Sequence, residues 1–246
     1  EEAALLTVSC AGGSDFRLSL PIDRTVMHGT KISLEIQGLK GGHSGVDIDK
    51  NRVNASILAG RLLHDAKKTA AFDIIKIDGG TKGNAIPFCC KVELVAEDAE
   101  SLKHVIEDCF SAVKKEIRDR EEHGSIRLTV GAAGNFEVLG PSARDKLLYM
   151  LLTTPNGVVD MSTEIDGLVE TSLNLGILMT EADKIVLHYT LRSNKESALL
   201  FLEARLAAFA SYTGCRFEIS GRYAPWEFKK DSPLQKLYRD AFCEKF

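Results

Sequence analysis

Residues 31–37, Lys-Ile-Ser-Leu-Glu-Ile-Gln, carry an apolar side chain at every second position. This period of two is typical of a strand with one buried face. Apolar residues at helical spacing follow in residues 52–68, and again from 98 to 117 behind the capping residue Asp98. Further strands are expected at residues 72–78, 88–96 and 126–130. From residue 31 to 130 the predicted order is strand, helix, strand, strand, helix, strand.

A second series of elements begins after Gly140-Pro141. Residues 184–191 alternate apolar and polar side chains, and the capping box Ser193-x-x-Glu196 precedes a helix that Gly214 ends. Strands are also expected within residues 5–20, 158–161, 168–179 and 217–220, and helices from Ser142 and Ser232. Because the two series share an order, the sequence predicts an α+β fold of two ferredoxin-like subdomains with antiparallel sheets.

The composition narrows the class of protein. The chain has 246 residues, of which 44% are hydrophobic and 27% are charged, which is ordinary for a globular protein. The net charge of -4 gives no basic surface for nucleic acid or anionic membranes. No apolar run approaches the roughly 18 to 20 residues that span a bilayer, and no signal peptide is visible. A cytoplasmic protein with no nucleic-acid or membrane partner is therefore expected.

The metal-binding residue types are scattered. The six cysteines form no CxxC pair, and no two of the six histidines are four residues apart. Zinc sites and disulfide frameworks usually show such spacings. We therefore expect no metal site made by this chain alone.

His43 lies in the glycine-rich stretch Gly41-Gly42-His43-Ser44-Gly45. Glycines permit a tight turn that presents the imidazole, which can donate a hydrogen bond to an oxyanion or a carboxylate. A glycine-rich turn with an incidental histidine is the alternative interpretation.

Two further residues are candidates for ligand binding. Asn84, within Gly79-Gly80-Thr81-Lys82-Gly83-Asn84-Ala85-Ile86-Pro87, can offer its amide to a ligand backbone. Arg192 ends the alternating strand, and its planar guanidinium suits a carboxylate. An ordinary connecting loop and a solvated surface arginine are the alternatives.

Together these stretches resemble the aminoacyl-histidine dipeptidases. The motifs that carry the resemblance occur in the same order in that family and cover nearly the whole chain. They are residues 10–13, 41–48, 78–87, 155–158, 169–176, 191–194 and 221–226.

The resemblance implies a substrate-capping lid over a two-zinc site. It carries the family's lid histidine, asparagine and arginine onto His43, Asn84 and Arg192. The histidine would stabilise the tetrahedral intermediate, and the other two would hold the substrate, the arginine by its C-terminal carboxylate. The metal ligands would lie in the catalytic domain, mostly outside this segment, which would be inactive alone. A dipeptide of the Xaa-His type is the implied substrate, and a homodimer is compatible with the resemblance.

The implied domain boundaries are a catalytic-domain flank at 1–27, lid subdomains at 28–135 and 136–222, and a second flank at 223–246. Two alternatives stay open. The chain would otherwise be the lid of a related zinc carboxypeptidase, tripeptidase or deacylase, or a non-catalytic ligand-sensing or interaction module, since a fold does not fix a function.

Overall fold

The computed structural model describes residues 7–245 of the chain. Its strands are β1 (Gly12–Pro21), β2 (Arg24–Gln37), β3 (Gly42–His43), β4 (Asp73–Gly79), β5 (Ala85–Ile86), β6 (Cys90–Ala96), β7 (Ser125–Leu139), β8 (Gly157–Met161), β9 (Val169–Thr180), β10 (Lys184–Ser193) and β11 (Arg216–Tyr223). Its helices are α1 (Ala55–Ala66), α2 (Ala99–Ile117), α3 (Pro141–Thr153), α4 (Glu196–Thr213) and α5 (Pro233–Lys245), with a short 3-10 helix at Ile48–Lys50.

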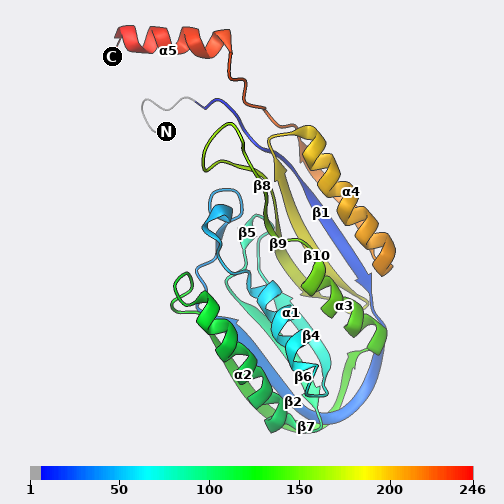
Figure 1. Ribbon diagram of the computed structural model, residues 1–246. Coiled ribbons are helices and arrows are strands. Elements are labelled where there is room, and N and C mark those ends of the chain that lie inside the picture. The colour runs from blue at the N-terminus through cyan, green and yellow to red at the C-terminus, as the bar shows by residue number, and fades with distance from the viewer. Residues whose placement is uncertain (1–6, 246) are drawn as a thin grey trace.

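One antiparallel sheet runs through the whole fold. Eight of its strands follow the order β11-β1-β10-β9-β4-β6-β2-β7, and β8 pairs with β9 beside them. Helices α1 to α4 lie along one face of this sheet (Figure 1). We call the other face the open face. The predicted α+β class with shared antiparallel pairing is confirmed.

The first half of the sheet is a ferredoxin-like unit. Its elements follow the chain order β2, α1, β4, β6, α2, β7, and its strands lie in the order β4-β6-β2-β7. This is the βαββαβ pattern of that fold. The predicted order for residues 31–130 is therefore confirmed.

The second half repeats this pattern, but its first strand, β1, is separated from its other elements in the sequence by the whole first half. It consists of β1, α3, β9, β10, α4 and β11, with strand order β11-β1-β10-β9. Residues 24–139, the whole first half, are inserted between β1 and α3. At the insertion point the Gly140 amide donates to the Asp23 carbonyl at 2.9 Å. Residues 12–21, which the sequence suggested as part of a catalytic-domain flank, lie inside the sheet between β10 and β11.

The two halves meet through equivalent elements. The second strand of each unit, β4 and β9, pair at Gly79 and Leu178. The first helix of each unit, α1 and α3, pack together so closely that a side chain at Gly60 would collide with Leu151. One sheet and one helical layer therefore span both halves.

The core lies between the sheet and the helices. On α2 the predicted apolar stripe is correct: Leu102, Ile106 and Val113 are buried, and Val105 is partly buried against them. On β10 the alternating Leu187, Tyr189 and Leu191 are all buried. Full burial of one such aliphatic side chain stabilises the fold by about 1.5–3 kcal/mol. It follows that the intervening residues of β10 point to the open face.

Several local predictions were wrong. The strand expected to end at Gly131 continues to Leu139, because the extended β2 offers a partner along its whole length. Residues 12–21 form one strand; the predicted start at Leu5 lies outside the described residues. Helix α3 begins at Pro141 behind Gly140, with no side-chain cap. The Ser193 hydroxyl is held by Thr171 and the Lys195 amide, so no capping box forms before α4.

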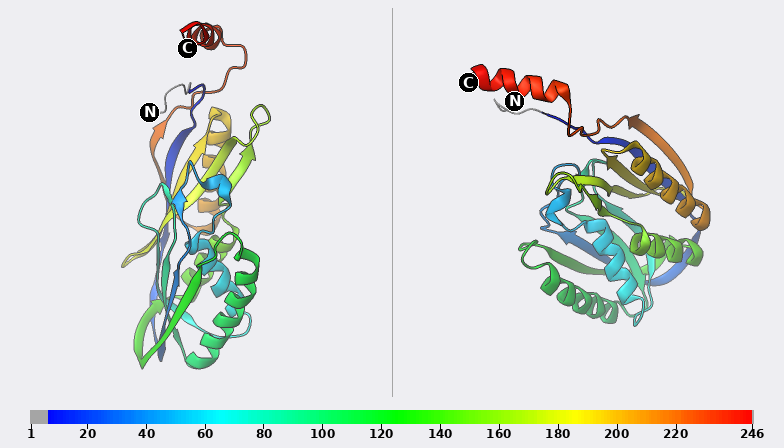
Figure 2. Two further views of the ribbon diagram at one scale, coloured as in Figure 1. Left: turned by 90° about the vertical axis from the view of Figure 1, so that its left-hand side faces the viewer. Right: turned by 45° about the horizontal axis from the view of Figure 1, so that its top comes forward.

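Helix α5 stands apart from the sheet at the C-terminal end of the described chain (Figures 1 and 2). It has no buried residue, and it exposes Leu234, Leu237 and Tyr238. Within residues 7–245 no helix is both long enough and apolar enough to cross a bilayer.

Candidate functional site

The glycine-rich loop around His43 is fixed to the loop that carries Asn84. Strand β3 pairs with β5, so that His43 lies opposite Ala85. The Ser44 amide donates to the Asn84 carbonyl at 2.9 Å. The two loops that carry these predicted site residues, 41 positions apart in the sequence, are therefore joined by backbone pairing.

His43 is exposed, and its ring has a defined orientation. Its Nδ1 accepts a hydrogen bond from the Gly45 amide at 3.1 Å. A neutral imidazole that accepts at Nδ1 carries its proton on Nε2. The ring therefore presents an Nε2–H donor away from its own loop.

The Asp47 side chain stabilises the turn that carries His43. Its carboxylate accepts from the His43 amide at 2.9 Å and lies 2.6 Å from the Lys50 ammonium and 3.2 Å from the Arg52 guanidinium. The hydrogen bond from Lys50, followed by the one from His43, lowers the pKa of Asp47 below its ordinary value. The carboxylate is therefore charged at neutral pH and holds the turn.

Gly45 brings His43 and Arg192 together. A Cβ atom at Gly45 would lie 3.1 Å from His43 Cε1 and 3.2 Å from Arg192 Nε. Both distances are shorter than ordinary van der Waals contacts, so the His43 and Arg192 side chains leave little room for a side chain at Gly45. The imidazole and the guanidinium are thus neighbours across one glycine, although 149 positions separate them in the sequence.

A cavity of about 340 Å³ lies beside this junction on the second half of the sheet. Its walls include Asn84, from the loop, and Arg192, from the end of β10. The other lining residues are Ser14, Asp15, Gly83, His188, Thr190, Gly221 and Tyr223. His43 lies next to the cavity rather than in its wall. The structure therefore gathers all three predicted residues at one place.

The polar groups of Asn84 and Arg192 are only partly used by the protein. Arg192 Nη1 donates to the Tyr223 hydroxyl at 3.0 Å, while its buried Nε has no partner among the described residues. The side chain of Asn84 is exposed and makes no hydrogen bond within residues 7–245. Both side chains keep donors for a ligand.

The Asn84 loop is anchored to the sheet by Asn174. This residue lies in β9, within the strand expected at residues 168–179, and is buried. Its Nδ2 donates to the Ala85 carbonyl at 2.8 Å, and its Oδ1 accepts from Asn54 Nδ2 at 3.4 Å. Asn54 also caps α1. One buried amide pair therefore ties the loop to both halves of the fold.

The sequence interpretation missed Asp15, His188 and Thr190, which line the same cavity. Thr190 donates to Asp15 Oδ1 at 3.1 Å. His188 Nε2 lies 3.3 Å from the same oxygen, an ion-pair distance, yet it makes no hydrogen bond among the described residues. A signal was present, because His188, Thr190 and Arg192 occupy every second position of β10, opposite its apolar face.

No group of three or more His, Cys, Asp or Glu side chains within residues 7–245 is placed to hold a metal ion. The described residues therefore do not fit a zinc site, and the two zinc ions that the resemblance implies would need ligands from elsewhere in the parent protein.

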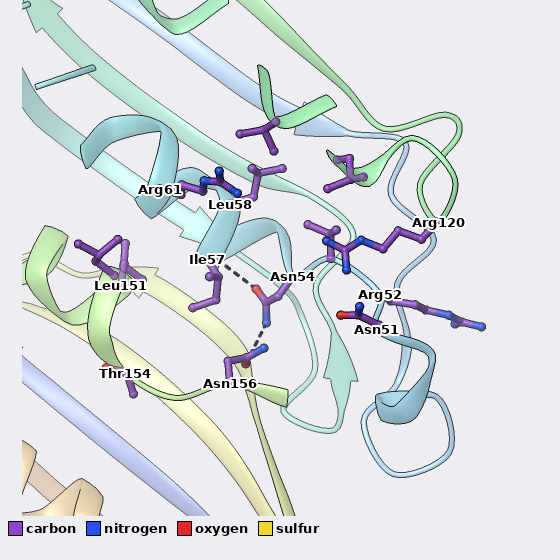
Figure 3. Close-up of a pocket in the computed structure, with 14 residues that line it drawn as sticks. Asn51, Arg52, Asn54, Ile57, Leu58, Arg61, Arg120, Leu151, Thr154 and Asn156 are labelled. Carbon is purple, nitrogen blue, oxygen red and sulfur yellow. Dashed lines mark hydrogen bonds between the residues drawn. The ribbon is translucent and has the colours of Figure 1, made fainter. Parts of the chain in front are cut away.

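A second cavity, of about 290 Å³, lies among α1, α2 and the segment after α3 (Figure 3). Arg52, Arg61 and Arg120 line it. Arg61 is paired with Glu116 at 2.7 Å and Arg52 is paired with Asp47, so carboxylates already neutralise two of the three cations. None of the predicted site residues lines this cavity. We therefore assign the candidate site to the cavity beside Arg192.

Comparisons with known proteins agree with this architecture. Residues 34–121, in the first half, match the peptidase dimerisation domain family. The whole chain is 30% identical over 250 residues to the cytosol non-specific dipeptidase of Escherichia coli (strain K12), covering 51% of that protein.

The structure is also similar to that of an aminoacylhistidine dipeptidase from Vibrio alginolyticus, with a TM-score of 0.87 and 31% identity over 95% of this chain and 48% of that one. The chain spans about half the length of the relatives that it matches. This similarity along almost the whole chain is in line with the family resemblance that the motifs carry.

Proposed function

We propose that the parent protein of this segment is a metal-dependent dipeptidase and that this chain supplies the lid over its substrate. The observation that carries the proposal is the grouping of His43, Asn84 and Arg192 around one cavity. Similarity to two dipeptidases along almost the whole chain supports it.

In this proposal His43 is the oxyanion donor. Its Nδ1 is occupied by the Gly45 amide, so Nε2–H is the free donor. A donor aimed at charge that develops only in the transition state lowers the barrier without tightening ground-state binding. Asp47 and Gly45 fix the ring before the substrate arrives, which avoids the cost of ordering it during the reaction.

Arg192 and Asn84 hold the substrate. The free donors of the Arg192 guanidinium would bind the C-terminal carboxylate of the dipeptide, and the Asn84 amide would bind its backbone. A dipeptide has its carboxylate about one residue from the scissile bond. A fixed cation at that distance from His43 would select peptides of two residues.

Two zinc ions are proposed for the parent protein, with ligands in the catalytic domain. When bound, such a pair activates water and polarises the scissile carbonyl. The segment's own contribution is to bind, to orient and to donate a hydrogen bond at His43.

The proposed partners are a dipeptide of the Xaa-His type and a second copy of the parent protein. Homodimer formation is supported by the match of residues 34–121 to a dimerisation domain. A cytosolic location is supported by the similarity to the cytosol non-specific dipeptidase of Escherichia coli. The exposed apolar side chains of α5 support the proposal that this helix packs on the catalytic domain.

The test compares a dipeptide with its C-terminal amide in the full-length parent. Arg192→Ala and Arg192→Lys should lower kcat/KM for the acid by about 10- to 150-fold, the value of charge-assisted hydrogen bonds of about 1.5–3 kcal/mol. Neither variant should affect the amide, which has no carboxylate. Lysine cannot replace the planar guanidinium, so Arg192→Lys should not restore activity.

Arg127→Ala is the matched control, because Arg127 also projects from a strand but pairs with Glu35 in the first half. It should leave both substrates unaffected. Equal losses for acid and amide in the Arg192 variants would show that Arg192 stabilises the fold and does not bind the substrate carboxylate.

A further inference from the structure

The guanidinium of Arg192 stands at the end of a strand and must be held there to act as a fixed anchor. A free arginine side chain loses rotamer entropy when it binds a ligand. Among the described residues its one side-chain hydrogen bond is from Nη1 to the hydroxyl of Tyr223, at 3.0 Å. Tyr223 lies on β11, two strands away from β10.

Gly13 is the gap through which this contact is made. On β1 it pairs with Arg192 on one side and with Tyr223 on the other. A Cβ atom at Gly13 would lie 2.6 Å from the Leu191 carbonyl oxygen, 2.8 Å from the Tyr223 hydroxyl and 3.0 Å from its Cζ. Neighbouring strands are about 4.8 Å apart, so a side chain at the middle position would block a contact between the outer two. The glycine lets the phenol lie across β1.

A bulge in β11 turns Tyr223 to the required face. Ser220 pairs with Asp15 and Tyr223 pairs with Gly13, so the register shifts by one residue between them. In a regular strand, positions three apart point to opposite faces. Because the bulge adds one residue, Tyr223 points to the same face of the sheet as Ser220. Gly221, with φ of +60°, supplies the left-handed conformation that such a bulge favours.

We propose that Tyr223 is a positioning residue that holds Arg192 for the substrate carboxylate, and that Gly13 and the Gly221 bulge exist to bring its hydroxyl there. The proposal rests on the proposed function of Arg192. The phenol oxygen accepts one of the four hydrogens on Nη1 and Nη2 and leaves the other three for the ligand, while the Nε hydrogen is buried. Tyr223 itself lines the cavity, so the anchor and its support enclose the same space.

The first experiment uses Tyr223→Phe in the full-length parent, with a dipeptide acid and its amide. Loss of the hydroxyl should lower kcat/KM for the acid by about tenfold, mainly through KM, as expected for a hydrogen bond to a charged group. The amide should be unaffected. Tyr212→Phe is the matched control, because that ring on α4 is 83% exposed and lies outside the cavity, and it should change neither substrate.

The second experiment separates positioning from general support of the fold. In the Arg192→Ala background, Tyr223→Phe should have no further effect on the acid, because the group it positions is absent.

The possible failures are distinct. An equal loss for acid and amide in Tyr223→Phe, or the same tenfold loss in the Arg192→Ala background, would overturn the positioning role while leaving that of Arg192 intact. A failure of Arg192→Ala to distinguish acid from amide would overturn both.

Discussion

On the open face of the first half of the sheet, charged side chains form ion pairs with one another. On the open face of the second half, a cavity is lined by polar groups of which some have no hydrogen-bond partner among the described residues. In the first half, Lys31 pairs with Glu93 at 2.9 Å, and Glu35 pairs with Lys91 at 3.2 Å and with Arg127 at 3.4 Å. In the second half, His188 Nε2 and Arg192 Nε have no hydrogen-bond partner within residues 7–245.

The two halves therefore show one backbone pattern with two uses. Both are ferredoxin-like and both bury an apolar face under helices. Their difference lies in the residues at alternate strand positions that do not enter the core. In the first half complementary charges pair with one another there, while in the second half arginine, histidine, hydroxyl groups and glycine line the candidate site.

The largest expected difference concerns His43. In the full-length parent, His43→Ala should lower kcat by about 100- to 1,000-fold with little change in KM, because one oxyanion donor acts mainly in the transition state. The measurement is steady-state kinetics with a dipeptide. His104→Ala, an exposed histidine on α2 of the first half, should leave kcat within about twofold. A normal kcat for His43→Ala would show that His43 is not an oxyanion donor and that its loop is only a connecting turn.

The second difference is between a buried anchor of a loop, Asn174, and an exposed helix cap, Asp98. Asn174→Ala should lower the free energy of unfolding by about 1–3 kcal/mol, because it leaves buried polar groups unpaired, and should also lower kcat/KM through the Asn84 loop. Asp98→Ala, which removes the cap of α2, should cost about 1 kcal/mol without changing activity. Urea unfolding and kinetics measure the two effects. If both variants lose activity alike, the Asn174 anchor has no special role in the site.

A smaller effect is expected at Gly45. The added methyl group of Gly45→Ala would press on both His43 and Arg192, so kcat/KM should fall by about tenfold while stability stays within about 0.5 kcal/mol. Gly131→Ala in β7 is the control, since a Cβ atom there meets the Lys31 carbonyl at an ordinary 3.4 Å. Unchanged kinetics for Gly45→Ala would mean that the contact between the two side chains is not needed.

The smallest effect is expected on the first half's ion pairs. Glu35→Gln removes the partner of two cations, yet exposed pairs contribute only about 0–1 kcal/mol each. The free energy of unfolding measured in urea should change by no more than the sum of these two contributions, and kcat/KM should be unchanged. A loss of activity would show that the first half's open face also takes part in the site.

The sequence predicted the elements of the first half well, because each lies next to its neighbours along the chain and shows its period directly. The second half was harder. Its first strand, β1, has no local signal that it pairs with β10 and β11, so it was assigned to a flank. The failed caps at Ser142 and Ser193 have a similar cause, since Pro141 starts one helix and a strand contact occupies the other serine.

At the site, the motifs identified His43, Asn84 and Arg192, whose roles stay predictions. They could not reveal that Gly45 joins two of them, or that Tyr223 reaches Arg192. Those contacts depend on strand register and on a bulge, which alternation in a single strand does not specify. The polar side of β10 did contain the missed His188 and Thr190.

The insertion of the first half between β1 and α3 has a consequence for folding during synthesis. The first half is contiguous, so it can fold as soon as residue 139 has left the ribosome. Strand β1 emerges earlier but pairs with residues such as Thr190, 175 positions after Asp15. Such distant pairings form slowly and leave strand edges exposed in the meantime. The completed first half presents β4 as an edge for β9, so the half that carries His43 and Asn84 would serve as the template on which the half that carries Arg192 is assembled.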